Sequence, residues 1–164
     1  MTKSPVSIRA ARLPADGDQI VALYQETAQW HHHRWPTDIR VPPGAGMRSI
    51  LTELLSLDDN QSFLRVAELD ERLVGLISAN LNPKPSTGLD IYTGPIVSIG
   101  DLIVTASARR HGIGARLMIA VEDWARLHHA ASITLSMHAG NDAALALYEN
   151  RGYRSTNVHM RKDL

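Results

Sequence analysis

The chain has 164 residues, and its 17 Lys and Arg residues balance 17 Asp and Glu residues, so the formal net charge is zero. Nucleic-acid and anionic-membrane binders need a basic excess, so this balance argues against both kinds of partner. The absence of cysteine excludes disulfides, thiolate metal sites and a covalent acyl-cysteine intermediate, and it suits a reducing cytoplasm.

A single domain with a sizeable core is expected from this length and an apolar fraction of 44%. The N-terminus lacks the apolar core of a signal peptide, and no apolar run approaches the length of a membrane span. We therefore expect a cytoplasmic protein.

The first half of the chain predicts a strand, a helix, an irregular segment, a second helix and a hairpin. Weak alternation predicts the strand over Val6–Arg12, and Asp16 is placed as the N-cap of a helix that reaches about Trp30. Prolines and glycines make His31–Gly46 irregular. The remaining elements are a helix over Met47–Leu57 and strands over Ser62–Leu69 and Leu73–Asn80, joined by a turn at Asp70-Glu71.

The second half begins with a loop over Asn82–Pro95, which holds three prolines and two glycines. A strand, a helix, a strand, a helix and a last strand follow, over Ile96–Val104, Gly112–His129, Ser132–Met137, Asn141–Asn150 and Tyr153–Met160. No repeat or linker interrupts this order, which predicts a single α/β layer fold.

The stretch from Leu102 to Gly114 carries the most specific pattern. Arg109, Gly112 and Gly114 form R-x-x-G-x-G where an apolar strand leads into a helix. Glycines at a helix start let an anion approach the backbone N–H groups, and the arginine adds a charge-assisted contact to phosphate. The pattern predicts a pyrophosphate cradle, with an ordinary glycine-containing turn as the alternative. It is neither the Rossmann fingerprint nor a Walker A loop.

A second pattern lies on the helix that follows the next strand. Asn141, Ala144 and Tyr148 share one helical face, where a small alanine permits close approach and two polar side chains flank it. Gly152 suits the end of that helix.

Together, the two patterns resemble the GCN5-related N-acetyltransferase superfamily. That family reads L-x-V-x-P-x-x-R-x-x-G-x-G and, later, N-x-x-A-x-x-x-Y-x-x-x-G-[FY]. The matching residues here are Leu102, Val104, Arg109, Gly112 and Gly114, then Asn141, Ala144, Tyr148, Gly152 and Tyr153. The chain departs from the family at Ala106, where proline is usual, and at Gly100. At the latter position many relatives have a glutamate that acts as the general base or orients a water molecule for it.

The resemblance implies one domain with a mixed central sheet of about six to seven strands and about four flanking helices. A bulge in the Ile96–Val104 strand would accompany a splay from the Ser132–Met137 strand. Acetyl-CoA would be the co-substrate, and its acetyl group would pass directly, in a ternary complex, to a primary amine of a small molecule, peptide or protein. A non-catalytic acyl-CoA-binding or sensing domain and a metal-binding module are the alternatives.

The resemblance also implies a set of cofactor contacts. The pantetheine arm would lie along the strand and the pyrophosphate on the following loop, with Arg109 at its entry. The residues implied are Leu102, Ile103, Val104, Arg109, Arg110, His111, Gly112, Ile113, Gly114, Ala115, Asn141, Ala144 and Tyr148.

For the chemistry, the Val104 N–H would stabilise the oxyanion and Tyr148 would protonate the leaving thiolate. The base is open because Gly100 replaces the usual glutamate. Asp101 is a candidate base, although strand alternation turns it away from the Gly100 side. His138 is expected to be a surface histidine, with proton acceptance through water as its alternative role.

In this family the segment after the first helix often lines the acceptor pocket. His32, His33 and Trp35 are therefore candidate acceptor contacts, and Asn82–Pro95 is a second candidate wall. Three consecutive histidines on a helix point about 100° apart, so they converge poorly on one ion and no metal is expected. A homodimer is compatible with the resemblance, because dimers are common among relatives.

Overall fold

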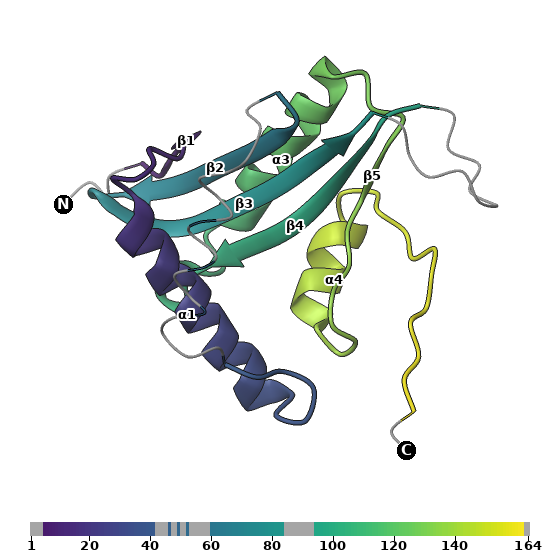
Figure 1. Ribbon diagram of the computed structural model, residues 1–164, viewed down its shortest axis with the longest axis horizontal. Helices are drawn as coiled ribbons and strands as arrows, with labels where there is room; N and C mark the ends of the chain where they lie inside the picture. Colours follow the sequence, from purple (N-terminus) through teal and green to yellow (C-terminus); the bar gives the residue numbers. More distant parts are fainter. Residues whose placement is uncertain are drawn as a thin grey trace.

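The computed structural model describes residues 5–41, 46, 49, 52, 60–83 and 94–162. One mixed sheet in the order β1-β2-β3-β4-β5 forms its centre (Figure 1). The first four strands pair antiparallel and β5 joins β4 in parallel. The strands are β1 (Ser7–Ala10), β2 (Ser62–Leu69), β3 (Arg72–Asn82), β4 (Ile96–Val104) and β5 (Ser132–Thr134).

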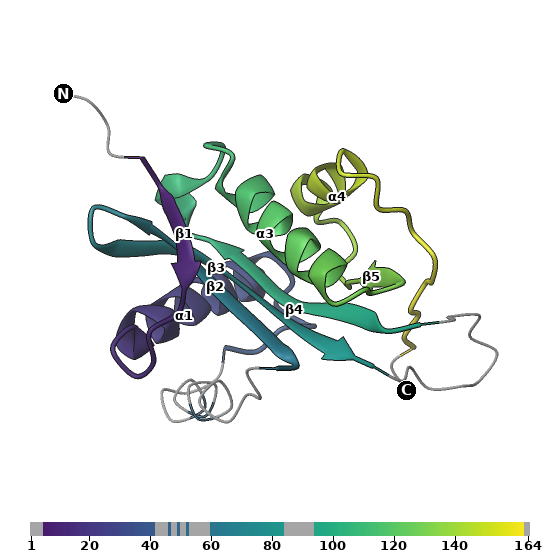
Figure 2. The same ribbon diagram turned by 90° about the horizontal axis from the view of Figure 1, so that it is seen from above.

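Helices cover both faces of the sheet, with α1 on one side and α3 and α4 on the other (Figure 2). The helical elements are α1 (Gly17–Arg34), the 3₁₀ turn η1 (Ala106–Ala108), α3 (Ile113–Leu127) and α4 (Asp142–Glu149). The helix predicted over Met47–Leu57 falls almost wholly outside the described residues, as does most of the predicted loop Asn82–Pro95.

Two apolar layers result from the alternation of side chains along the strands. On one face, Val97 and Ile99 pack with Leu117 and Val121 of α3, whose apolar residues recur every four positions. On the other face, Ile103 packs with residues of α1. The central β3 is buried on both faces, which anchors β4 as its neighbour.

The fold class is the predicted one, a single α/β layer structure, but the described residues contain five strands rather than six to seven. They contain three of the expected α-helices, and the fourth is the one over Met47–Leu57 that falls almost wholly outside the described residues. The strand predicted over Tyr153–Met160 is wrong, since this segment pairs with no strand among the described residues. A strand requires a partner along its length, and β5 is only three residues long. Val158 and Met160 are consequently 86% exposed.

Helix α1 is longer than predicted, because it continues through His31–His33 to Arg34. The Trp35 N–H caps it by donating to the His31 carbonyl at 2.8 Å. Asp16 precedes the helix as predicted, yet its carboxylate makes no capping bond. Its oxygens accept instead from the Arg9 guanidinium and the Arg12 N–H, and this pairing with Arg9 lowers the pKa of Asp16 below its usual value.

Strand β4 has the two irregularities that the family resemblance implies. Its pairing with β5 is limited to three residues and ends at Ser98 and Thr134, so the two strands splay beyond that point. On its other edge, Ser78 pairs with Asp101 and Ala79 pairs with Ile99, which leaves Gly100 as the extra residue of a β-bulge.

Candidate functional site

The splay exposes one edge of β4. The Thr105 N–H donates to the Val74 carbonyl of β3 at 2.9 Å, so the backbone groups of Val104 point the opposite way, toward the side that β5 has left. The same alternation directs the N–H and carbonyl of Leu102 to this open edge, while those of Ile103 face β3. The edge can therefore accept an extended ligand as a strand would.

The loop after β4 presents a concentration of backbone donors. Arg110 and Gly112 have positive φ values of 65° and 74°, a conformation that turns successive N–H groups into one concavity. In the part of the chain that is described, no acceptor takes the N–H groups from Gly112 to Ala115. These are the unsatisfied donors at the start of α3, where the helix dipole also favours an anion.

Glycine is required at positions 112 and 114 for two different physical reasons. A Cβ on Gly112 would meet nothing within 4 Å, but its positive φ is one that side chains rarely adopt. A Cβ on Gly114 would lie 3.3 Å from Leu147 Cδ2 of α4 and 3.9 Å from Val104 Cγ2. Gly112 therefore provides the turn, whereas Gly114 lets α3 begin close to β4 and α4.

The Arg109 side chain, which is predicted to contact phosphate, contacts two other parts of the protein in this structure. Its Nε donates to the Val104 carbonyl at 3.0 Å, and its guanidinium carbon lies 5.0 Å from the centre of the Trp30 ring. The side chain thus links the open edge of β4 to α1. His111, by contrast, is exposed, and its Nδ1 lies 2.7 Å from the Arg109 carbonyl.

Helix α4 brings the second motif to the same side of the sheet as α3. Asn141 is the N-cap, since its side chain accepts from the Ala144 N–H at 3.3 Å. Tyr148 is partly buried against the apolar core, and burial raises the pKa of its phenol. Gly152 follows with a φ of 85°, and Tyr153 lies 6.1 Å from Tyr148 between ring centres.

Asp101 projects from β4 to the opposite face, toward α1. Its Oδ2 accepts from the Tyr24 hydroxyl at 2.7 Å and from the Ser78 hydroxyl at 3.0 Å, and the Asp101 N–H donates to Ser78 Oγ at 3.0 Å. Neither Tyr24 nor Ser78 belongs to a motif that would mark it as a partner of Asp101. They lie 77 and 23 residues from Asp101, so no local pattern relates them.

Glu26 of α1 is a second residue without a sequence signal. Its carboxylate accepts from the Thr105 hydroxyl at 2.6 Å and from the Ala106 N–H at 2.7 Å. These bonds fix α1 to the start of the loop that leads into α3. Helix α1, on one side of the sheet, is therefore bonded directly to the loop that leads to α3 on the other side.

The predicted acceptor residues lie at the end of α1, but their side chains do not form one cluster. Trp35 stacks on His138 with ring centres 3.9 Å apart, while His32 and His33 are exposed. The Nδ1 of His32 lies 2.6 Å from the Ile39 carbonyl. Within the described ranges, no three His, Cys, Asp or Glu side chains are grouped to hold a metal ion.

His138 is half-buried rather than the exposed surface histidine that the sequence predicts, and it pairs with Asp38. Its Nε2 lies 3.1 Å from Asp38 Oδ2, and the other Asp38 oxygen accepts from Arg161 at 2.9 Å. The hydrogen bond from His138 lowers the pKa of Asp38. These contacts connect the end of α1 with the segment after β5 and with the C-terminal segment.

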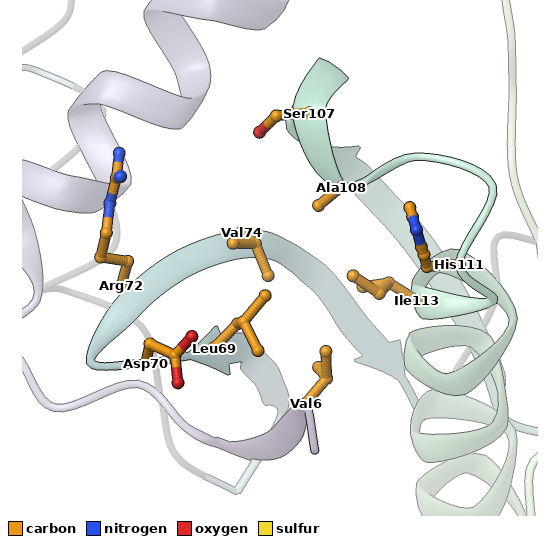
Figure 3. A pocket seen from close by; sticks show the side chains of 9 residues that line it. All are labelled: Val6, Leu69, Asp70, Arg72, Val74, Ser107, Ala108, His111 and Ile113. Carbon is orange, nitrogen blue, oxygen red and sulfur yellow. The ribbon is translucent and has the colours of Figure 1, made fainter. Parts of the chain in front are cut away.

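A cavity of about 330 Å³ is lined in part by Ser107 and Ala108 of η1. Leu69, Val74 and Ile113 surround it with apolar side chains, and Arg72 and His111 lie at its border (Figure 3). Neither the open edge of β4 nor Asp101 or Tyr148 contributes to its lining. It adjoins the loop between β4 and α3 instead, because His111 and Ile113 contribute to its lining.

The comparisons with known proteins agree with this geometry. The model of the Acetyltransferase (GNAT) family matches residues 20–153, so the chain belongs to the GNAT acetyltransferase family. The uncharacterized N-acetyltransferase YhfO of Bacillus subtilis (strain 168) is 32% identical over 97 residues, which span 59% of this chain and 62% of that protein.

Two solved structures share the fold at lower identity. A variant of the BH1408 protein from Bacillus halodurans superposes with a TM-score of 0.81 at 22% identity, covering 96% of this chain and 99% of that one. Aminoglycoside N-acetyltransferase AAC(6')-Iy, in complex with the bisubstrate analogue CoA-S-monomethyl-acetylneamine, gives 0.70 at 19% identity, covering 98% and 100%.

In the residues that the structure covers, no helix combines the length and the apolar character that crossing a membrane requires.

Proposed function

We propose that this protein transfers the acetyl group of acetyl-CoA to a primary amine of a small molecule or peptide, directly and in a ternary complex. One observation carries the proposal: the edge of β4 that β5 leaves open leads to the start of α3, where the N–H groups from Gly112 to Ala115 have no acceptor among the described residues. An extended arm with a pyrophosphate at its end matches both features. The GNAT family match supports the same reaction class.

In this proposal, acetyl-CoA is held mainly by backbone groups. Its pantetheine arm bonds to Leu102 and Val104 on the open edge of β4, as an added strand. Its pyrophosphate accepts from the N–H groups between Arg110 and Ala115. Asn141, Ala144 and Tyr148 form the opposite wall, where the Ala144 side chain leaves room for the arm.

The transfer needs charge stabilisation and proton movement. The Val104 N–H points to the open edge and donates to the oxygen on which negative charge develops. Burial of Tyr148 raises its pKa, so the phenol keeps its proton at neutral pH and gives it to the departing thiolate. With no cysteine in the chain, an acyl-cysteine intermediate has no nucleophile, which favours direct attack by the amine.

The acceptor approaches from the α1 face of the sheet. The bound analogue of AAC(6')-Iy combines CoA with an acetylneamine, which makes small-molecule amines the first class to test. Trp35 at the end of α1 is the proposed acceptor contact on the described surface, and His32 and His33 lie exposed beside it.

A panel of amines tests the proposal: aminoglycosides, polyamines, amino-acid amides and short peptides, each mixed with acetyl-CoA while CoA thiol release is followed. We expect at least one amine to give equal amounts of free CoA and N-acetylated product. Saturable acetyl-CoA binding without thiol release on every amine would favour the non-catalytic acyl-CoA-binding alternative.

A further inference from the structure

The bulge at Gly100 decides which way Asp101 points. Val97 and Ile99 face α3, so uninterrupted alternation would turn Asp101 to that face as well. The extra residue shifts the phase by one, and Ile103 accordingly packs on the α1 side. Asp101 therefore faces α1, which is the side left for the acceptor when the cofactor lies with α3 and α4.

The Asp101 carboxylate is held by one oxygen only. Tyr24 and Ser78 both donate to Oδ2, at 2.7 Å and 3.0 Å. No described group hydrogen-bonds the other oxygen, Oδ1, and this oxygen is not fully buried. One oxygen thus fixes the orientation while the other stays accessible for a polar ligand.

Gly100 lies directly against the Ser78 side chain. A Cβ on Gly100 would lie 3.1 Å from Ser78 Oγ, closer than most real Cβ contacts. A side chain at position 100 would therefore press on the hydroxyl that holds Asp101. The chain combines the missing glutamate at this position with a carboxylate fixed one residue further on.

We propose that Asp101 accepts the proton of the acceptor ammonium through Oδ1, and that Tyr24 is the positioning residue that holds this carboxylate toward the acceptor. The inference rests on the proposed acetyltransferase function and adds the base that Gly100 cannot supply. Tyr24 acts through Asp101 and does not touch the reacting atoms.

The proton balance of the step is complete without another reactant. The ammonium gives one proton to Asp101, and the neutral amine then attacks the thioester carbonyl carbon. The N–C bond forms and the C–S bond breaks, and the thiolate leaves with the Tyr148 proton. The second nitrogen proton returns to the Tyr148 oxygen, and Asp101 releases its proton to water.

The test compares two acceptors that differ in the need for a base. One is the best primary alkylamine from the panel. The other is its β,β-difluoro analogue, whose ammonium form is far more acidic, so that a much larger fraction of the amine is neutral at the assay pH. Alkylamines with a pKa near 10.4 are only about one part in a thousand neutral at physiological pH. Only the first acceptor therefore depends strongly on proton removal by the protein.

For Asp101→Asn we expect kcat/KM with the alkylamine to fall by about a hundredfold, and with the fluorinated amine by less than about fivefold. Tyr24→Phe should show the same selectivity with a fall of about tenfold, as expected for a residue that only orients the base. Ser78→Ala is the second positioning variant, should Tyr24→Phe fail to fold.

Asp123→Asn, on the exposed surface of α3, and Ser62→Ala, on β2, are the matched controls and should leave both rates unchanged. Equal losses on both acceptors would assign Tyr24 and Asp101 a purely structural role and overturn the inference. Unchanged rates in Asp101→Asn would overturn it while leaving the acetyltransferase function intact. Failure of the wild type on every amine would overturn both.

Discussion

The two faces of β4 are built in different ways. On the α3 and α4 face, the proposed cofactor site consists mostly of backbone groups: the open edge near Val104 and the N–H groups that begin α3. On the α1 face, the proposed acceptor side consists of side chains that pair across the fold, such as Tyr24 with Asp101 and Glu26 with Thr105.

This difference explains why one face was predictable. Backbone donors need glycines and a helix start at fixed local spacing, so Gly112, Gly114 and Asn141 are visible as motifs. Side-chain pairs separated by 77 to 100 residues, such as Asp38 with His138, leave no local pattern. Substitutions on the two faces should accordingly affect different measured quantities.

The largest expected effect is that of Tyr148→Phe. Loss of the phenolic proton should lower kcat by about a hundredfold or more, because general acid catalysis contributes on that scale. The acetyl-CoA Kd, measured by calorimetry, should change by less than about threefold, since one hydroxyl contributes little to a mostly backbone site. An unchanged kcat would remove Tyr148 from the acid role and break the contrast between binding and proton transfer.

The start of α1 should control stability rather than cofactor binding. Asp16→Asn loses the charged bonds to Arg9 and should lower the free energy of unfolding at pH 7 by about 2 kcal/mol. Because the folded-state pKa of Asp16 is lowered, its contribution is present above the unfolded pKa and disappears as pH falls through the folded value. Urea unfolding from pH 7 to pH 2 should therefore show a shallower decline in the variant, and parallel curves would contradict the assignment.

The loop glycines sharpen the comparison on the cofactor face. Gly112→Ala must hold a side chain at positive φ, which costs about 1–2 kcal/mol and should weaken acetyl-CoA binding by about tenfold if the loop relaxes. Gly114→Ala, at ordinary φ, must displace Leu147 by a few tenths of an ångström and should cost less. Calorimetric Kd values that rank the two variants in reverse would contradict the roles assigned to them.

The smallest effect is expected at the end of α1. Asp38→Asn weakens the contacts to His138 and Arg161 and should increase amide hydrogen exchange in residues 153–162. The acetyl-CoA Kd should stay within about twofold of wild type, because these exposed ion pairs contribute little to the free energy. Unchanged exchange would show that the C-terminal segment is held by other contacts.

The sequence predicted the architecture best where hydrophobic periodicity and turn residues agreed. The α3 helix, the β2–β3 hairpin and the helix predicted over Asn141–Asn150 are confirmed within a few residues. The strand over Tyr153–Met160 is wrong, because propensity does not say whether a partner edge is available. The first helix continues past His31 because aromatic packing around Trp35 stabilises an end that composition alone makes irregular.

The orientation of Asp101 is the instructive failure within the site. The sequence located the carboxylate and the glycine beside it, and the strand period gave a direction for each. The bulge changes that period by one residue, and its position depends on pairing with Ser78 of another strand. A bulge can be expected from a family resemblance, but its consequence for one side chain requires the register.

The most direct measurement is a calorimetric titration of the protein with acetyl-CoA and, separately, with acetyl-pantetheine, which lacks the pyrophosphate. The account predicts one saturable site per chain for acetyl-CoA and binding at least about tenfold weaker for acetyl-pantetheine, since charge-assisted bonds to the loop are lost. The absence of saturable acetyl-CoA binding at high micromolar concentration, or equal affinity for the two ligands, would contradict it.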